Sequence, residues 1–394
     1  MIMKVALVVH TAYPDFIGGR EHHVHYLASR LSQTDEVVVI AGGKTGKIQE
    51  RKISGYRLIT LPMISIKVSR NPLQIYRIIW KLFPILKIEK PDLIHAFEYG
   101  SYSTDVTYLY SKKYNIPFMI TVYGYQFKNP ILKFLKIVYN YFIGRKLYEE
   151  ASGVFYSSEA QYREILGVIR KDIRSKIVFQ ENCIPVNNFK YAVPKQDLLK
   201  SYNLHDNEIK LLTVLRILPR KGLRYLVLAL EKIIKENHLG KIKLLIVGPD
   251  CGELKNIKTM VKKAKLKNNI IIVGPVAPHR IKDFLGIADI FVLPSLYEAL
   301  PLALLEAMAA GKAVIFTSLP CAKKVIIDEK DGLLVKPADV DSLKRAIYRL
   351  CCDKELRQRL GYNARKKAIN FDYQIEATKL RQVYTKILLD KVEE

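Results

Sequence analysis

The chain has 394 residues, 49% hydrophobic and 26% charged, which excludes a disordered protein and is too long for one ordinary core. Its net charge of +26 fits nucleic acid, an anionic membrane or a phosphorylated substrate as partner, and equally a surface that is merely rich in lysine. No signal peptide, zinc-site cysteine spacing or bilayer-spanning apolar run is visible, so we expect a cytoplasmic protein with reduced thiols and no metal.

Short apolar runs alternate with helical patterns along the whole chain. The runs are rich in valine and isoleucine and are apolar on both faces, which is typical of parallel strands covered by helices. The predicted strands are residues 4–9, 36–41, 92–97, 117–122 and 153–158, followed by 209–215, 242–248, 269–274, 289–295 and 313–317. This alternation predicts a doubly wound α/β architecture.

The strand pattern restarts at residue 209, after a stretch at 183–197 that has two prolines and little periodicity. We place the linker in that stretch, since each series is long enough for its own Rossmann-like domain. The predicted parts are an N-terminal domain over 1–188, a C-terminal domain over 189–368 and a last segment over 369–394. The last segment contains an amphipathic helix at 373–389.

Two glycines, Gly18 and Gly19, precede a predicted helix after the first strand. Glycines let the backbone approach a ligand and present N–H groups to phosphate. The spacing is not that of the GxGxxG fingerprint. Three histidines at 22, 23 and 25 follow, but no acidic or cysteine set completes a metal site, so we assign them to the first turns of the helix.

Two stretches of the N-terminal half combine basic residues with aromatic and aliphatic ones. In residues 128–148 the only charges are basic, and residues 64–88, which include Trp80, have the same character. At helical spacing this composition suits a helix in the headgroup region of an anionic membrane. The alternative is that both helices pack on the N-terminal sheet with their lysines in water.

A basic loop follows the first strand of the second series. Arg216 and Lys221 lie between the strand that ends at Leu215 and a helix that begins near Gly222. Ligands of doubly wound folds bind at the carboxyl ends of strands, and two cations there would offset the charge of a leaving diphosphate. The alternative is a solvated basic loop.

The stretch "EALPLALLE" places Glu298 and Glu306 in an apolar setting with seven residues between them. Pro301 suits the first helical turn and Gly311 the position after the helix end, so Glu298 precedes a helix N-terminus and Glu306 lies inside the helix. Such a terminus attracts phosphate, while the two carboxylates can accept hydrogen bonds from hydroxyls on either side of a diphosphate. The pattern predicts a nucleotide-sugar site that also includes Leu300. The alternative is a helix cap and a surface residue.

These motifs together resemble the family-4 retaining glycosyltransferases (glycosyl transferases group 1). The resemblance extends over nearly the whole chain and rests on "GGREHHVHYLA", "PDLIHAF", "RILPRKG" and above all "EALPLALLE" followed by "AMAAGKAV". It implies the GT-B fold, with two Rossmann-like doubly wound parallel-sheet domains facing a central cleft. It also implies that the N-terminal domain binds the acceptor, the C-terminal domain binds the nucleotide sugar, and the last helix crosses back.

The resemblance assigns roles to the site residues. Glu306 would hold the ribose, Glu298 the donor sugar, and Arg216 and Lys221 the diphosphate, with the pair Gly18 and Gly19 facing the donor. The chain departs from the family where Tyr123, in "TVYGYQF", replaces a usual histidine, so its acceptor-side role is open. Two further departures are Leu215, in place of a usual glycine, and "ENCIPVNNF", in place of an NG-I-D turn.

The resulting expectation is a hexosyltransferase that moves a sugar from a nucleotide diphosphate to a hydroxyl acceptor, lipid-linked or a growing glycan. It needs no metal or cofactor, binds no nucleic acid and docks on the inner face of the membrane. The rivals are an epimerase or phosphorylase of the same fold, and a nucleic-acid-binding protein suggested by charge alone.

Overall fold

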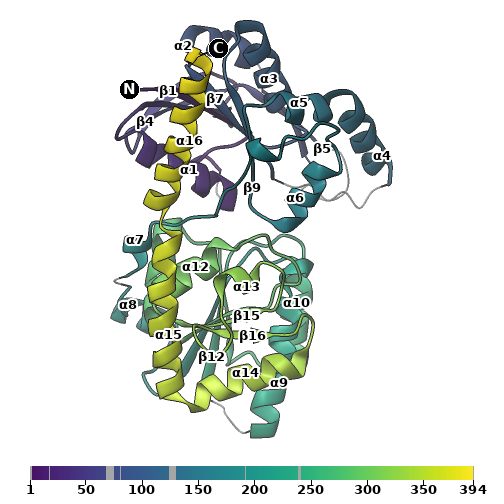
Figure 1. The fold of residues 1–394 in the computed structure, drawn as a ribbon. Coiled ribbons are helices and arrows are strands. Elements are labelled where there is room, and N and C mark those ends of the chain that lie inside the picture. Colours follow the sequence, from purple (N-terminus) through teal and green to yellow (C-terminus); the bar gives the residue numbers. More distant parts are fainter. Residues whose placement is uncertain are drawn as a thin grey trace. The chain divides into compact units, whose positions relative to one another are not determined.

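The computed structural model describes residues 2–16, 18–67, 75–79, 81–123, 130–190, 192–237 and 241–393. The chain forms two compact units (Figure 1). Unit 1 comprises Met1–Cys183 and Tyr373–Glu394, and unit 2 comprises Ile184–Asp372. Each unit has a parallel sheet with its own hydrophobic core, so the predicted pair of Rossmann-like domains is confirmed.

Unit 1 is built on an eight-stranded sheet with the order β10-β9-β8-β7-β1-β2-β4-β3. All neighbours are parallel except β3 and β4. The strands are β1 (Lys4–Val9), β2 (Glu36–Gly42), β3 (Gln49–Ile53), β4 (Tyr56–Leu61), β7 (Leu93–Phe97), β8 (Phe118–Thr121), β9 (Gly153–Tyr156) and β10 (Ile177–Phe179). The helices are α1 (Gly19–Leu31), α2 (Leu82–Glu89), α3 (Tyr102–Tyr114), α4 (Pro130–Tyr139), the π-helix η1 (Asn140–Gly144), α5 (Arg145–Glu150), α6 (Glu159–Leu166) and α16 (Tyr373–Glu393).

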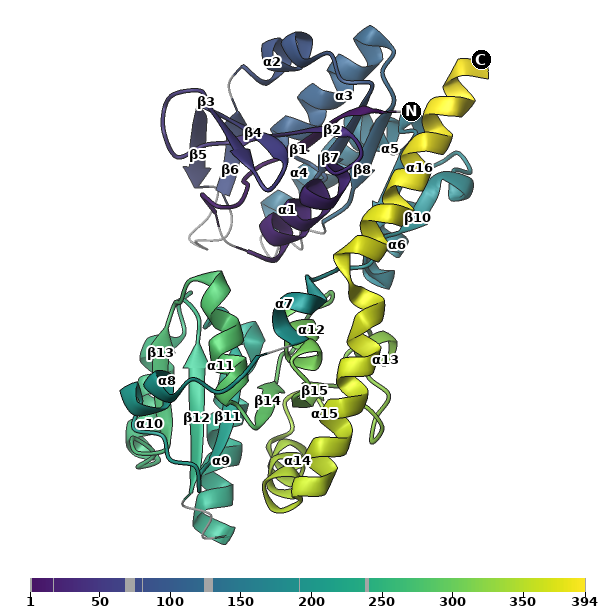
Figure 2. The same cartoon turned by 90° about the vertical axis from the view of Figure 1, so that its left-hand side faces the viewer.

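The last helix belongs to unit 1. Helix α16 runs along α1 in both views (Figures 1 and 2). It buries Ala377, Leu380 and Tyr384 against the same core as β1 and β2. The Tyr384 hydroxyl also lies 2.6 Å from Nδ1 of the buried His95 on β7, and this hydrogen bond helps to tie the C-terminal segment to the sheet.

Unit 2 has a six-stranded, wholly parallel sheet with the order β13-β12-β11-β14-β15-β16. The strands are β11 (Ile209–Val214), β12 (Ile242–Val247), β13 (Ile270–Gly274), β14 (Ile290–Leu293), β15 (Ala313–Thr317) and β16 (Leu333–Val335). The helices are α7 (Val186–Lys190), α8 (Gln196–Ser201), α9 (Leu223–Asn237), α10 (Leu254–Lys263), α11 (Ile281–Ile287), α12 (Leu302–Ala309), α13 (Ala322–Val325), α14 (Val340–Cys352) and α15 (Lys354–Ala368).

The expectation of a helix over residues 64–88 is wrong in the described part. Residues 64–88 are not one amphipathic helix, because β5 (Met63–Lys67) pairs with β6 (Ile75–Ile79) as an antiparallel ribbon and only α2 is helical. Isoleucine alternates with other residues at 64–67, which favours a strand, and Pro84 is tolerated only in the first helical turn, so α2 starts late. Trp80 and Lys128 lie outside the described residues.

Candidate active site

The carboxyl edge of the unit 2 sheet has a switch point between β11 and β14. The chain leaves β11 for β12 on one side of it and later returns to β14 on its other side. Doubly wound folds bind ligands in the crevice outside the strand ends at such a point. Lys221 belongs to the connection after β11 and Glu298 to the connection after β14, so both lie on the loops at this point.

Lys221 and Glu298 form a buried ion pair. Their side chains are 12% and 8% exposed, and Ser295 Oγ donates to Glu298 Oε1 at 2.7 Å. Burial lowers the pKa of the Lys221 ammonium, while the adjacent Glu298 carboxylate opposes that shift. An anionic ligand at the switch point would therefore meet a desolvated cation that is held in place by a carboxylate.

The backbone holds Lys221 against the end of β14. The turn Pro219–Lys221 ends at Gly222, whose φ of 67° lies in the left-handed region that favours glycine. A Cβ at Gly222 would lie 2.0 Å from the carbonyl oxygen of Pro294, so no other residue fits without displacing the strand end. Arg216, the second predicted phosphate ligand, is exposed at the start of the same connection.

Helix α12 carries the second predicted glutamate. Pro301 is the N-cap of α12, so the helix starts one residue later than a proline in the first turn would imply, and Leu300 packs on the unit 2 core. Gly311 follows the helix end with a φ of 70°, as the sequence predicts. The buried face of α12 is formed by Leu304, Leu305, Ala307, Met308 and Ala309.

Glu306 is a partly buried carboxylate on the opposite side of α12. Desolvation raises its pKa to about 7. Among the described residues, none forms an ion pair or a side-chain hydrogen bond with it. Its oxygens can therefore accept hydrogen bonds from a ligand, at a cost in stability that the fold itself does not offset.

The raised pKa makes a stability prediction. A carboxyl whose pKa is higher in the folded than in the unfolded state destabilises the fold as pH rises through that value. Glu306→Gln should therefore raise the free energy of unfolding by about 1–3 kcal/mol at pH 8 and by little at pH 5. Urea unfolding at both pH values measures this, with the exposed Glu355→Gln as matched control. If Glu306→Gln raises the free energy of unfolding equally at both pH values, the Glu306 carboxylate is not destabilised by burial.

Unit 1 has its own switch point, between β1 and β7, and Gly18 and Gly19 lie on the connection after β1. Gly18 is the extended N-cap of α1, without a side-chain cap, and Gly19 is the first helical residue. Tyr123 follows β8 nearby, and burial raises the pKa of its hydroxyl. That hydroxyl is buried and has no hydrogen-bond partner among the described residues.

A charged cluster at this edge was not predicted from the sequence. Arg20 Nη1 lies 2.8 Å from Oε1 of Glu98, which is 1% exposed, and Arg20 Nη2 lies 3.0 Å from Glu21 Oε1. His10 Nδ1 lies 3.5 Å from Glu98 Oε2. The only available signal was the position of His10 and Glu98 directly after β1 and β7. With two carboxylates and one guanidinium, the cluster favours hydroxyl groups over phosphate as ligands.

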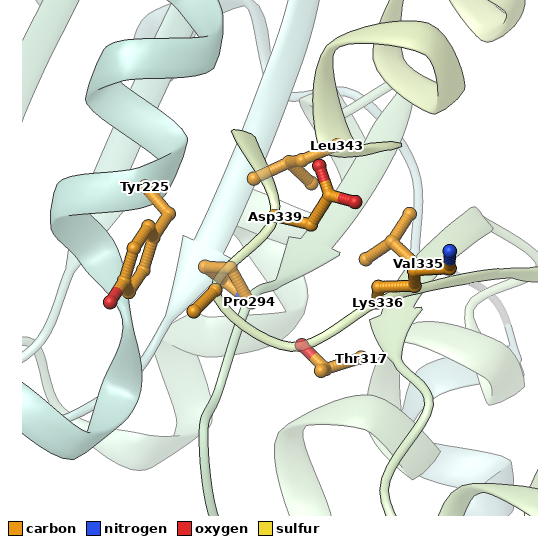
Figure 3. A pocket seen from close by; sticks show the side chains of 8 residues that line it. Tyr225, Pro294, Thr317, Val335, Lys336, Asp339 and Leu343 are labelled. Carbon is orange, nitrogen blue, oxygen red and sulfur yellow. The ribbon is translucent and has the colours of Figure 1, made fainter. Parts of the chain in front are cut away.

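In unit 2, a small pocket lies near the carboxyl edge of the sheet, between α9, α14 and the ends of β14 to β16 (Figure 3). It does not include Lys221, Glu298 or Glu306. Asp339, labelled in the figure, accepts from the Ser342 backbone N–H as the N-cap of α14, which gives its carboxylate a structural role. No group of three or more histidine, cysteine, aspartate or glutamate side chains suited to a metal occurs in the described residues.

Two family models match the chain. The model for glycosyl transferases group 1 matches residues 194–367, and the model for glycosyltransferase family 4 matches residues 17–186. The chain belongs to the family-4, group 1 glycosyltransferases. The family and the enzyme class predicted from the "EALPLALLE" element are thereby confirmed.

Two relatives of this glycosyltransferase have names that refer to lipids. A UDP-Gal:alpha-D-GlcNAc-diphosphoundecaprenol alpha-1,3-galactosyltransferase of Escherichia coli is 28% identical over 318 residues, which cover 79% of each chain. An alpha-monoglucosyldiacylglycerol synthase of Streptococcus pneumoniae is 24% identical over 84% of this chain and 75% of its own length.

Solved structures show the same fold. A sucrose-phosphate synthase from Thermosynechococcus elongatus covers 98% of this glycosyltransferase and 100% of its own chain, with a TM-score of 0.77 and 22% identity. Anabaena HepE in complex with UDP-glucose covers 98% of this chain and 100% of its own, with a TM-score of 0.74 and 16% identity. The GT-B fold class is confirmed.

Proposed function

We propose that this glycosyltransferase moves a hexose from a nucleotide diphosphate to a hydroxyl of a lipid-linked acceptor, with retention at the anomeric carbon. The observation that carries the proposal is the buried Lys221–Glu298 pair at the β11/β14 switch point. A cation and a hydroxyl-binding carboxylate are held side by side where the diphosphate and the sugar of a donor would meet.

The donor residues divide the nucleotide sugar among them. Glu306 accepts hydrogen bonds from the ribose hydroxyls, and Glu298 accepts them from the hexose. Lys221 and the exposed Arg216 bind the diphosphate, Arg216 as a planar fork and Lys221 as a point charge. Leu300 and Pro301 lie between the two glutamates in sequence.

Retention needs no protein nucleophile in this scheme. The bond from the anomeric carbon to the diphosphate oxygen breaks, and its electron pair leaves with the diphosphate. The acceptor oxygen bonds to the anomeric carbon on the same face, and its proton passes to a phosphate oxygen of the leaving group. Catalysis then rests on positioning and on stabilising the negative charge of the diphosphate.

The lipid-linked acceptor is supported by two relatives, one named for a diphosphoundecaprenol acceptor and one for a diacylglycerol lipid. No described helix is long and apolar enough to cross a bilayer. A lipid-linked acceptor is met at a bilayer, so the proposal includes peripheral contact with the inner face of the cell membrane.

Donor binding and turnover test the proposal. A panel of nucleotide sugars should include one that raises the unfolding temperature, and that donor should transfer its hexose to a lipid-linked sugar acceptor. Anomeric NMR of the product should show the donor's configuration. Turnover of the donor without an acceptor would favour an epimerase, and dependence on free phosphate would favour a phosphorylase. Selective affinity for nucleic acid over nucleoside diphosphates would favour the remaining rival.

The metal-free scheme makes a further prediction. Because Lys221 and Arg216 supply the positive charge beside the diphosphate, added EDTA should leave the transfer rate unchanged. The rate is measured with the preferred donor before and after exhaustive chelation. A clear loss that Mg²⁺ or Mn²⁺ restores would contradict the assignment of the charge to these two side chains.

A further inference from the structure

Helix α4 and the π-helix η1 expose a continuous apolar surface on unit 1. No residue of α4 is buried, and eight large apolar side chains are 37% to 67% exposed. We call these side chains the α4 surface. They are Ile131, Phe134, Leu135, Ile137, Val138, Tyr141, Phe142 and Ile143. An apolar patch of this kind on one helix marks an interaction site.

The helix is held firmly by its other side. The Tyr139 hydroxyl donates to Asp105 at 2.6 Å, and Lys136 forms an ion pair with Glu164 at 2.5 Å. Immediately after η1, α5 buries Leu147 and Tyr148 in the unit 1 core. Figure 1 shows α4 at the margin of unit 1, next to α5 and α6. The apolar side chains are therefore presented by an anchored helix.

The spacing within the α4 surface is that of one helix face. Ile131, Phe134, Leu135 and Val138 stand at positions i, i+3, i+4 and i+7, which project in one direction. The anchoring residues Lys136 and Tyr139 project away from that face. The side chains of the apolar stripe are therefore 37% to 67% exposed, while the contacts described for α4 with Asp105 and Glu164 come from Tyr139 and Lys136.

The charge around the stripe is basic. From residue 130 to residue 148 every charged residue is a lysine or an arginine, and Lys133 and Lys146 are exposed. Arg170 adds a guanidinium 5.7 Å above the Tyr141 ring. Each cation near an anionic bilayer strengthens its attachment, and exposed apolar groups insert at the boundary of headgroups and acyl chains.

Basic charge alone is not distinctive in this chain. Helix α10 of unit 2 exposes Lys255, Lys258 and Lys262, but its apolar residues Ile257 and Val261 are buried in the unit 2 core. The same charge therefore occurs there without an apolar surface, which makes α10 a matched control for electrostatic attraction.

We propose that the α4 surface docks on a phospholipid bilayer that contains anionic lipid, with its aromatic side chains at the headgroup level. This proposal rests on the proposed function, since a lipid-linked acceptor must be met at a membrane. It commits to a bilayer because the basic residues flank the apolar stripe along a single helix, which is the pattern of an interfacial helix.

Co-sedimentation of the full chain with vesicles tests the proposal. The vesicles contain phosphatidylcholine alone or mixed with phosphatidylglycerol. We expect binding only to the mixed vesicles and a decrease with salt. Phe134→Ser/Phe142→Ser and Lys133→Glu/Lys146→Glu should each reduce the bound fraction by about tenfold or more. Lys136 and Arg145 are left intact because they lie beside Glu164 and Glu149.

The controls separate the docking surface from the catalytic proposal. Lys255→Glu/Lys258→Glu changes the net charge equally and should bind as the wild type does. All variants should show the same rise in unfolding temperature with the preferred nucleotide sugar as the wild type does. If no nucleotide sugar raises the unfolding temperature of the wild type, the donor site is refuted and the docking surface is not. Equal binding to both kinds of vesicle, or an equal loss in the α10 variant, would overturn the docking proposal. So would a wild-type dimer that the Phe134→Ser/Phe142→Ser variant converts to a monomer, because a second copy would then occupy the surface.

Discussion

Lys221→Ala is expected to lower kcat by about 100-fold or more, with a smaller rise of KM for the donor. Negative charge grows on the diphosphate as its bond to the sugar breaks, and the buried ammonium interacts with that charge most strongly in the transition state. Steady-state kinetics with the preferred donor and acceptor measure both constants. Arg224→Ala removes an exposed cation on the adjacent helix α9 and should change neither.

The Glu298 partner needs a control of its own. Removing Lys221 leaves a buried carboxylate without its cation, which destabilises a fold by several kcal/mol on the order-of-magnitude scale for buried pairs. The double variant Lys221→Ala/Glu298→Gln should recover stability without recovering kcat. If Lys221→Ala instead raises KM and leaves kcat unchanged in a folded enzyme, the lysine only binds the ground state.

Glu306→Ala is expected to weaken nucleoside diphosphate binding tenfold or more. Hydrogen bonds to a charged acceptor contribute roughly 1.5–3 kcal/mol, and the ribose would lose a pair of them. Isothermal calorimetry measures the affinity. In the ligand-free protein the pKa of Glu306 is about 7. The affinity of the wild type for the nucleoside diphosphate should therefore fall as the pH drops below 7 and the carboxylate takes up a proton.

The pH series provides the contrast. Glu306→Ala should show a smaller change in affinity between pH 8 and pH 6 than the wild type, since the titrating acceptor is gone. Unchanged affinity at pH 8 in a folded variant would refute the ribose assignment. A parallel pH dependence in both proteins would locate the titration in another group.

The strands most accessible to sequence reasoning were those in the middle of the sheets. Residues 4–9 and 313–317 are strands with the predicted bounds, because a strand buried on both faces is apolar at nearly every position. Strand β4 was missed although it is mostly buried and lies between β2 and β3. The other missed strands of the two main sheets, β3, β10 and β16, lie at sheet edges, where one side lacks a neighbour and the segments are short or partly polar. Such strands depend on pairing more than on composition.

The same distinction applies to the site. The seven-residue spacing of Glu298 and Glu306 around a helix start is local, and the structure retains it because Pro301 and Gly311 delimit α12. The contact of Lys221 with Glu298 joins residues 77 positions apart. It depends on β11 and β14 being neighbours, and strand order is a property of the whole sheet.

The sequence by itself determined the class of fold, the family and the bounds of the helix near Glu298 and Glu306, since hydrophobic periodicity and turn residues act over a few positions. Only the tertiary structure decided which charges meet. It brought Arg20, Glu21 and Glu98 together at the β1/β7 edge and paired Lys221 with Glu298. It also decided which face of residues 130–143 stays exposed, because burial depends on the helices and strands that pack against a segment and not on the segment's own composition.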